Sequence, residues 1–434
     1  MYKQSQFNVI QPIDKEYLIF NTLSGAMAKL NRETLNRLEN IENMTLDALE
    51  LQNMIKCGFI IKQSVSEVED LKKIQYQKRN TTNSLNLVIA PTLECNFNCG
   101  YCYESPEKGI ITKEGQDNIL KFCKDTLSSN KITTINVCWY GGEPLLYPDI
   151  IDNLSLNFLQ MCKDYNIKYT AIAVSNGSLI DNRLADKLIN NHIDKIQITL
   201  DGVEQVHNKR RPYMNNGNSF EKVINGIENL LSRDIQVLIR MNVDKGNQFE
   251  IEPLLKYLST RFINKSNLKF SLGCIFANDD NTYITNELLT SEEFSQIKYN
   301  TIFLLEKYGF TTSVKNILRS KKINYCGATK RLSYVISPTG DIYKCWNDIG
   351  KKELLIGNLD KAGKLENKLN DRCEKWLSHS IYINEKCKGC NVLPLCGGGC
   401  PRQQINCNKL PICEDIRFNI KQLVKLLYSQ KIRR

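Results

Sequence analysis

From Asn86 onward, short apolar runs alternate along the chain with longer stretches in which apolar residues recur every three or four positions. The short runs are typical of buried strands, and the longer pattern is typical of amphipathic helices. Their alternation predicts parallel β/α units, and six such units predict an α/β fold with an open, partial (β/α)6 barrel. The expected strands are Leu87–Ala90, Ile135–Trp139, Lys168–Val174, Lys195–Leu200, Gln236–Val243 and Lys269–Leu272.

Residues 1–75 show a different pattern. Strand-like runs around Phe7–Ile10 and Tyr17–Asn21 precede two helical patterns, the second at Leu46–Ile55, and Phe59–Ile61 resembles a short strand. This order predicts a separate, winged-helix-like α+β domain. The polar and charged stretch Lys72–Asn83 predicts a linker to the barrel, which we expect to occupy residues 84–310.

Beyond the barrel, a helical pattern at Ser291–Lys307 precedes a glycine- and cysteine-rich region that ends in a basic amphipathic helix, Asp415–Ile432. We expect residues 311–434 to form a third domain. The chain contains no run of 18 or more apolar residues, and its first ten residues lack the apolar stretch of a signal peptide. The sequence therefore predicts a cytoplasmic location and no membrane segment.

The formal net charge of +11 could indicate an acidic partner. The basic residues do not form a concentrated stripe, and no aromatic platform accompanies them, so we do not expect nucleic-acid binding. The value also counts cysteines as neutral, whereas each four-thiolate iron-sulfur centre adds roughly two negative charges.

Seventeen cysteines are unusual for a chain of this length. Disulfides are rare in the cytosol, and a disulfide framework scatters its cysteines, whereas cluster ligands occur in tight local groups. Here the cysteines gather at Cys95–Cys102 and again at Cys387–Cys413. The grouping indicates metal or cluster binding.

The first group, Cys95, Cys99 and Cys102, has the spacing C-x3-C-x2-C and follows the first barrel strand. A closed structural site needs four protein ligands, whereas three thiolates leave one iron open to a substrate or cofactor. A zinc loop that borrows a distant ligand is the alternative. It does not explain the position after a strand or the later Gly-Gly-Glu-Pro sequence that begins at Gly141.

These residues resemble the radical S-adenosylmethionine (SAM) superfamily, and the resemblance covers roughly residues 85–415. It implies a TIM-like partial barrel in which the open iron of a 4Fe-4S cluster chelates the methionine portion of S-adenosylmethionine. An electron from the cluster then breaks a carbon–sulfur bond and gives methionine and a 5'-deoxyadenosyl radical.

The resemblance also implies contacts to S-adenosylmethionine. The stretch Gly141–Pro144 would contact the methionine amino group, Ser175 and Asn176 would lie near the ribose, and Arg240 would pair with the carboxylate. Glycine allows close backbone approach, and a glutamate supplies an acceptor. Common turns and a barrel salt bridge are the alternatives for these residues. The proposed cofactor-binding set is Gly141, Gly142, Glu143, Pro144, Ser175, Asn176 and Arg240.

Asp201-Gly202, followed by His207 and Arg211, resembles a D-G-x4-H-x3-R stretch of the peptide- and protein-modifying branch of the superfamily. For His207 a structural hydrogen bond and a chemical role remain equally open.

The carboxyl-terminal cysteines resemble the SPASM extension, a domain that carries auxiliary iron-sulfur clusters. One zinc ribbon is the alternative, but it would leave three of these cysteines without a role. By the resemblance, one 4Fe-4S cluster would be closed by Cys387, Cys390, Cys396 and Cys413. A second would be held by Cys326, Cys345 and Cys400. Its fourth position stays open to Cys407, Cys274 or a substrate thiolate.

The resemblance leaves several functions in competition. The preferred one is a maturase that abstracts hydrogen from a ribosomally made precursor peptide and forms a thioether or carbon–carbon cross-link. The leader of that peptide would add as a strand to the N-terminal domain, at the Tyr17–Asn21 strand and the following helix. An electron donor such as flavodoxin or ferredoxin is a further expected partner. Dimerisation or packing is the alternative role for residues 1–75.

An anaerobic sulfatase-maturating enzyme is the second function. Two features disfavour it, because 94 residues precede Cys95 and because Trp346 follows Cys345 where such enzymes carry an aspartate, a proposed base. Asp348 lies two residues too late to be taken as its equivalent. A non-catalytic iron-sulfur scaffold for electron transfer is the third possibility.

Overall fold

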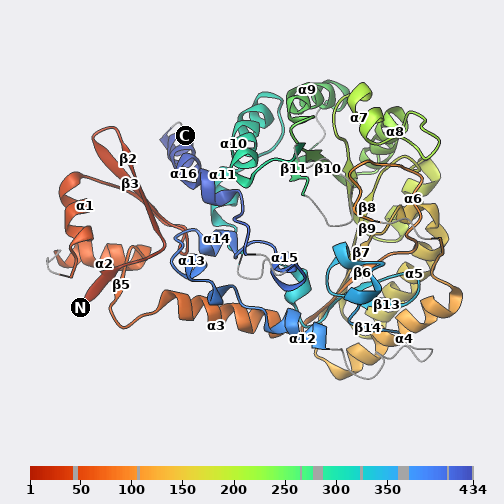
Figure 1. The fold of residues 1–434 in the computed structure, drawn as a ribbon, viewed down its shortest axis with the longest axis horizontal. Coiled ribbons are helices and arrows are strands. Elements are labelled where there is room, and N and C mark those ends of the chain that lie inside the picture. Colours follow the sequence, from red (N-terminus) through yellow and green to blue (C-terminus); the bar gives the residue numbers. More distant parts are fainter. Residues whose placement is uncertain are drawn as a thin grey trace.

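The computed structural model describes residues 1–42, 47–104, 108–263, 266–276, 287–322, 326–359, 371–407 and 410–432. The N-terminal unit lies at one end of an elongated molecule, the barrel at the other, and much of the carboxyl-terminal region lies between them (Figure 1).

The barrel contains the six predicted parallel strands in the predicted order. Neighbouring strands pair in parallel from β6 to β11. Their bounds are β6 Ser84–Ile89, β7 Thr134–Trp139, β8 Lys168–Ser175, β9 Ile193–Thr199, β10 Gln236–Val243 and β11 Leu268–Cys274. The prediction of an α/β partial barrel is confirmed.

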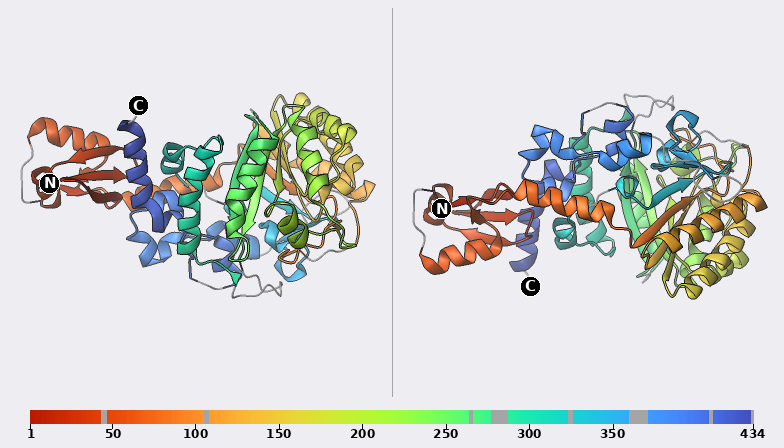
Figure 2. Two further views of the ribbon diagram at one scale, coloured as in Figure 1. Left: turned by 90° about the horizontal axis from the view of Figure 1, so that it is seen from above. Right: turned by 90° about the horizontal axis from the view of Figure 1, so that it is seen from below.

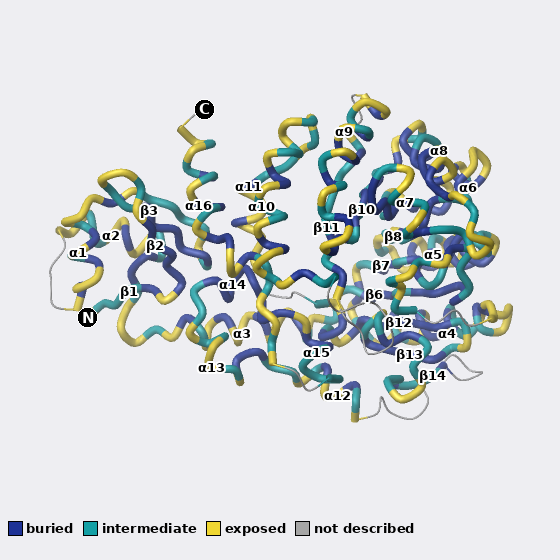
Figure 3. Tube along the Cα trace, turned by 45° about the horizontal axis from the view of Figure 1, so that its top comes forward, coloured by how far each residue is buried: buried dark blue, intermediate teal, exposed yellow. Residues whose placement is uncertain are grey.

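Alternation along each strand separates the two faces of this sheet. On β7, Ile135, Val137 and Trp139 are buried in the main core, while the intervening Asn136 and Cys138 are only half-buried. Successive side chains of a strand point to opposite faces, so the apolar set faces the surrounding helices and the polar set faces the barrel interior. Figure 3 shows exposed as well as buried positions on those helices. The helices include α4 Lys113–Ser129, α5 Pro148–Asp164, α6 Asn182–Asn190, α7 Glu204–Arg210, α8 Phe220–Leu231 and α9 Ile251–Arg261.

The carboxyl-terminal region begins by extending the barrel sheet. Strand β12 (Ser333–Ile336) pairs in parallel with β6, and β13 (Asp341–Tyr343) and β14 (Gly357–Asn358) continue the sheet in antiparallel fashion. The helices beside and after it are α10 Ser291–Lys307, α11 Val314–Arg319, α12 Asp371–Ser378, α13 Glu385–Lys388, α14 Leu393–Cys396, α15 Pro401–Ile405 and α16 Ile416–Ile432. The helices predicted from Ser291 and near Asp415 are confirmed.

The N-terminal unit contains a three-stranded antiparallel sheet in the order β2 (Asn8–Ile13), β3 (Glu16–Asn21), β4 (Met27–Leu30). Helices α1 (Arg32–Glu39) and α2 (Ala48–Cys57) follow. The predicted Leu46 start of the second helix lies outside the described residues. Strands β1 (Tyr2–Gln4) and β5 (Ile60–Lys62) form a separate antiparallel pair.

The N-terminal sheet is buried on both faces. Ile19 packs with residues of α1 and α2, whereas Leu18 and Phe20 pack with Leu423 and Val424 of α16. The N-terminal unit therefore shares a core with the carboxyl-terminal helix and is not a detached module.

The stretch from Lys72, which the sequence predicts to be a linker, belongs to helix α3 (Glu67–Asn80). Ser66 caps its start, and Glu67, Leu71, Gln75 and Arg79 form its buried side. Because three of these four residues are polar, the helix lacks the apolar periodicity that would reveal it in the sequence. Figure 2 shows α3 running from the N-terminal unit to the barrel. None of the described helices is both long enough and apolar enough to cross a bilayer.

Candidate cluster and cofactor site

The three cysteines of the first motif lie on the loop that follows β6, at the carboxyl end of the barrel strands. Burial raises the pKa of Cys95 to about 12 and that of Cys102 to about 11, and the thiol of Cys99 is close enough to add to both shifts. Among the residues that the structure describes, no three His, Cys, Asp or Glu side chains already converge as the ligands of a single ion would. Cysteines of a 4Fe-4S cluster bind different irons, so a cluster does not require its thiolates to meet at one point.

The two glycines of the Gly-Gly-Glu-Pro sequence pack directly against the cysteine loop. A Cβ at Gly141 would lie 2.3 Å from the carbonyl oxygen of Thr92, and one at Gly142 would lie 2.3 Å from that of Glu94. The backbone N–H of Glu143 donates a 2.8 Å hydrogen bond to the same Glu94 carbonyl. The glycines thus allow the loop after β7 to support the backbone of the cysteine loop.

The buried carboxylate of Glu143 joins the ends of β7 and β8. It accepts hydrogen bonds from the hydroxyl of Ser175 at 2.9 Å, the backbone N–H of Asn176 at 2.7 Å and the backbone N–H of Leu145 at 3.0 Å. Burial raises the pKa of Glu143, and these donors oppose the shift. The side chain of Asn176 in turn donates to Asn96 of the cysteine loop at 2.7 Å. The structure therefore brings Glu143, Ser175 and Asn176 together beside the cysteine loop.

Arg240 lies on β10 with its guanidinium directly over Gly273 of β11. A Cβ at Gly273 would lie 2.2 Å from an Arg240 nitrogen, so only glycine leaves room for this side chain. Its Nε donates to the side-chain oxygen of Asn242 at 2.8 Å. No carboxylate within the described ranges forms an ion pair with Arg240, so the alternative of a barrel salt bridge is not supported. The guanidinium can receive an anionic group.

His207 is fully buried and has a structural environment. Its Nδ1 accepts a hydrogen bond from the backbone N–H of Asp201 at 3.4 Å, and its ring packs edge-on against Phe220. Burial, with a contribution from Arg211, lowers the pKa of His207 well below its usual value. The ring is therefore neutral and supports the loop after β9.

The seven carboxyl-terminal cysteines form two spatial groups. Burial raises the pKa of Cys387 to about 11, and the neighbouring thiols of Cys396, Cys390 and Cys413 add to the shift. Arg417 of α16 also donates to the sulfur of Cys390 at 2.7 Å.

The second group contains the other three cysteines of this field. Burial raises the pKa of Cys345 well above its usual value, and the thiols of Cys326 and Cys400 lie close enough to raise it further. Cys274, by contrast, lies at the end of β11 near Asp244 and Arg240. The thiols of Cys407 and Cys345 both lie close enough to Arg402 to raise its pKa. Of the two candidate fourth ligands, Cys407 is the one near this group.

Aromatic side chains connect the first cysteine loop with the second cysteine field. The ring of Tyr140 stacks on Trp346, with centroids 5.2 Å apart and planes inclined by 19°. The hydroxyls of Tyr140 and Tyr103 form a short hydrogen bond. These residues adjoin Gly141, Cys345 and Cys102 in the sequence. The only signal for this contact in the sequence is that the three aromatic residues lie next to motif residues.

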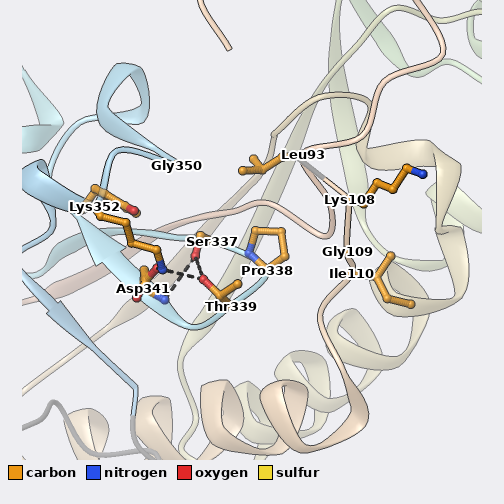
Figure 4. Close-up of a pocket in the computed structure, with 11 residues that line it drawn as sticks. Leu93, Lys108, Gly109, Ile110, Ser337, Pro338, Thr339, Asp341, Gly350 and Lys352 are labelled. Carbon is orange, nitrogen blue, oxygen red and sulfur yellow. Dashed lines mark hydrogen bonds and ion pairs between the residues drawn. The ribbon is translucent and has the colours of Figure 1, made fainter. Parts of the chain in front are cut away.

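Strands β12 and β13 also reach the cysteine loop. A small cavity of about 60 Å³ lies between Leu93 and Lys108–Ile110 of that loop and the turn at Ser337–Asp341 (Figure 4). Asp341 there accepts from Thr339 at 2.9 Å and pairs with Lys352. The cavity is too small for S-adenosylmethionine.

Comparison with known proteins places the barrel in a family. Residues 89–258, from the end of β6 into α9, match the model of the Radical SAM superfamily. The barrel region therefore matches this superfamily, and the predictions of a resemblance to it and of a radical SAM enzyme are confirmed.

Two curated relatives match most of the chain. The chain is 24% identical over 377 residues to the cysteine-type anaerobic sulfatase-maturating enzyme of Clostridium novyi, covering 80% of this chain and 98% of the relative. It is 22% identical over 439 residues to the radical SAM cyclopropyl synthase TigE of Paramaledivibacter caminithermalis, covering 91% and 88%.

Two solved structures share the fold. Native anSMEcpe with bound AdoMet superposes with a TM-score of 0.64 at 21% identity, over 80% of this chain and 99% of that chain. Streptococcus suis SuiB bound to precursor peptide SuiA superposes with a TM-score of 0.52 at 17% identity, over 96% and 99%. Since 96% of the chain is covered, the likeness to SuiB includes most of the N-terminal unit.

Proposed function

We propose that this chain is a radical SAM peptide maturase that cross-links a ribosomally made precursor peptide. The observation that carries the proposal is the combination of three cysteine groups with an N-terminal sheet that has a free edge. The likeness to SuiB, whose structure contains a precursor peptide, includes most of the N-terminal unit.

The residues around Cys95 fit a cluster and its cofactor. The thiols of Cys95, Cys99 and Cys102 would each lose a proton and hold three irons. When bound, the cluster and S-adenosylmethionine supply a 5'-deoxyadenosyl radical that abstracts hydrogen from the peptide. Arg240, which has a guanidinium without an acidic partner in the described part of the chain, would hold the cofactor carboxylate.

The remaining contacts to the cofactor come from the strand ends beside the cysteines. The backbone of Gly141–Pro144 would face the amino group, and Ser175 and Asn176 would lie near the ribose. Glu143 already accepts three hydrogen bonds, so its main role is to hold Ser175 and Asn176 in place.

The carboxyl-terminal cysteines would hold two auxiliary 4Fe-4S clusters. The Cys387 group supplies four thiolates and closes one cluster, which suits electron transfer or structure. The Cys326 group would take Cys407 as its fourth ligand. Formation of a cross-link removes two hydrogen atoms, one to the 5'-deoxyadenosyl radical and one as a proton, so one surplus electron remains for an auxiliary cluster to accept.

Strands β2 and β4 are the two edges of the N-terminal sheet, and β2 lies against α16. A leader strand would therefore add to β4 and not directly to the Tyr17–Asn21 strand. That strand, β3, is paired on both sides by β2 and β4. The N–H of Asn21 donates to the carbonyl of Ala26, and hydrogen-bonded pairs alternate along an antiparallel ladder. Met27 and Lys29 therefore point their backbone groups outward, where a leader strand can add.

The sulfatase-maturating function has weaker support. Trp346 occupies the position after Cys345, and Asp348 cannot substitute for the missing base. Asp348 is fully buried, accepts a 2.6 Å hydrogen bond from Arg402 and a 2.9 Å one from Asn406, and so does not face a substrate. The intact first motif also argues against a non-catalytic scaffold.

The test is co-expression with the short reading frames that adjoin the gene, followed by mass spectrometry of the peptides. We expect one peptide to lose two hydrogen atoms. Lys29→Pro removes an outward N–H of β4 that would pair with the leader, and it should therefore abolish this change. The ladder between β4 and β3 should remain intact, because a proline on the outward side of an edge strand removes none of its hydrogen bonds. Lys29→Ala, which removes only the side chain that pairs with Glu16, should retain it. Full modification by the proline variant would refute leader docking at β4.

A further inference from the structure

Arg211 is a buried arginine beside the first cysteine motif. It follows α7 directly, and only 8% of its surface is exposed. Its guanidinium lies 5.7 Å from the ring centroid of Phe97 and 6.0 Å from that of Tyr101. These two aromatic residues separate the three cysteines in the sequence, so Arg211 packs against both intervals of the motif.

The buried carboxylate of Asp201 lies near Arg211, but the two are joined through the hydroxyl of Tyr101, which donates to Asp201, and Arg211 itself forms no direct ion pair in the described residues. One of its terminal nitrogens donates to the Tyr101 hydroxyl at 2.5 Å, and its Nε has no hydrogen-bond partner. The preceding Arg210 differs, because it pairs with Asp244 at 2.8 Å and approaches Asp201 at 3.8 Å.

A buried cation without a direct ion pair is costly. Asp201, which also lies 3.8 Å from Arg210, is one nearby anion. The thiols of the first motif are others, because Phe97 and Tyr101, against whose rings the guanidinium lies, alternate with the three cysteines along the loop. A cluster bound there would add negative charge beside Arg211.

We propose that Arg211 is a positioning residue whose buried charge compensates the cluster held by Cys95, Cys99 and Cys102 and raises its reduction potential. This inference rests on the cluster assigned to those cysteines and does not depend on the identity of the peptide. Reduction adds one electron to the cluster, and a fixed cation close to it stabilises the added charge. Net charge and hydrogen bonding are the terms by which proteins set such potentials.

Packing alone is the competing role, since cation–π contacts also stabilise a fold. The two roles differ in what the substitution removes. Arg211→Gln removes the charge, whereas Arg211→Lys keeps the charge and loses the planar group that lies over the rings. Lys209→Gln removes an equal charge from an exposed position two residues away, where solvent screens it.

The experiment is a redox titration of the anaerobically reconstituted full chain, followed by electron paramagnetic resonance, with iron content measured in parallel. To isolate the first cluster, the cysteines Cys326, Cys345, Cys387 and Cys390 are replaced by alanine in every sample if the auxiliary signals overlap. We expect a more negative potential for Arg211→Gln, and a potential close to that of the parent for Arg211→Lys and Lys209→Gln.

Iron binding and the size of the shift in potential distinguish the two roles. If Arg211→Gln fails to bind iron while Arg211→Lys binds it, the charge role is supported. An unchanged potential in iron-loaded Arg211→Gln, or equal losses in the glutamine and lysine variants, would overturn it. Failure of the parent itself to bind iron would instead contradict the proposed cluster.

Discussion

The carboxylate of Glu143 accepts a 2.7 Å hydrogen bond from the backbone N–H of Asn176. This contact fastens the loop after β7 to the loop after β8, and Asn176 extends it to Asn96 between the cluster cysteines. The residues expected around S-adenosylmethionine thus belong to one hydrogen-bonded unit with the cysteine loop.

Substitution of Glu143 should disturb this unit. Glu143→Gln places an amide NH2 group opposite an N–H or O–H donor, so at least one hydrogen bond is lost. The free energy of unfolding should fall by about 2–3 kcal/mol, since hydrogen bonds to charged groups are worth roughly 1.5–3 kcal/mol. Ser175→Ala loses one of the three bonds and should cost about 1 kcal/mol. Urea unfolding of both variants checks the ranking, and a smaller loss for the glutamine variant would contradict it.

Gly142→Ala should prevent correct placement of the cysteine loop. The added methyl group would lie 2.3 Å from the carbonyl of Glu94, and overpacking of this kind costs about 1–3 kcal/mol or more. We expect reduced iron incorporation by the first motif. Gly100→Ala is the matched control, because a Cβ there meets nothing within 4 Å although Gly100 lies inside the motif. Equal iron content in the two variants would show that the glycine contact is unimportant.

Burial of neutral His207 should make stability fall in acid. Its pKa in the fold lies well below the value of about 6.5 in the unfolded chain. The unfolded chain therefore binds a proton that the folded chain excludes. The contribution of His207 to the free energy of unfolding is complete above about pH 6.5. Below that pH it decreases by about 1.4 kcal/mol per pH unit. In metal-free protein, the stability difference between wild type and His207→Gln should shrink between pH 7.5 and pH 5. A pH-independent difference would contradict the buried neutral ring.

The position of Cys407 predicts a selective effect on iron content. Cys407→Ser should lower the iron bound by the Cys326 group or change its spectrum, because Cys407 shares the surroundings of Arg402 with Cys345. Cys274→Ser should leave the iron content unchanged, since Cys274 lies near Asp244 and Arg240. Iron analysis and Mössbauer spectroscopy of the two variants compare them directly. The reverse pattern would assign the vacancy to Cys274.

The barrel could be predicted from the sequence because its strands have strong apolar patterns and its motifs follow strand ends. The alternation of Ile135, Val137 and Trp139 with polar residues is one such signal. Helix α3 could not be predicted, because its buried side includes the polar Gln75 and Arg79.

Strand order in the N-terminal sheet was also beyond the sequence. Met27–Leu30 is a four-residue strand without a clear alternation, so its pairing with β3 gives no local signal. The contact between Tyr140 and Trp346 depends on two segments about 200 residues apart, as the numbering shows. Such contacts follow from the tertiary packing of β12 beside β6.

The central claim is that three thiolates leave one iron open to S-adenosylmethionine. The most direct measurement is 5'-deoxyadenosine released by the reconstituted protein under anaerobic conditions with dithionite and S-adenosylmethionine. We predict steady release by the wild-type chain and none when Cys95, Cys99 and Cys102 are all alanine. Release by the triple variant at the wild-type rate, or a wild-type preparation that holds only zinc, would contradict the account.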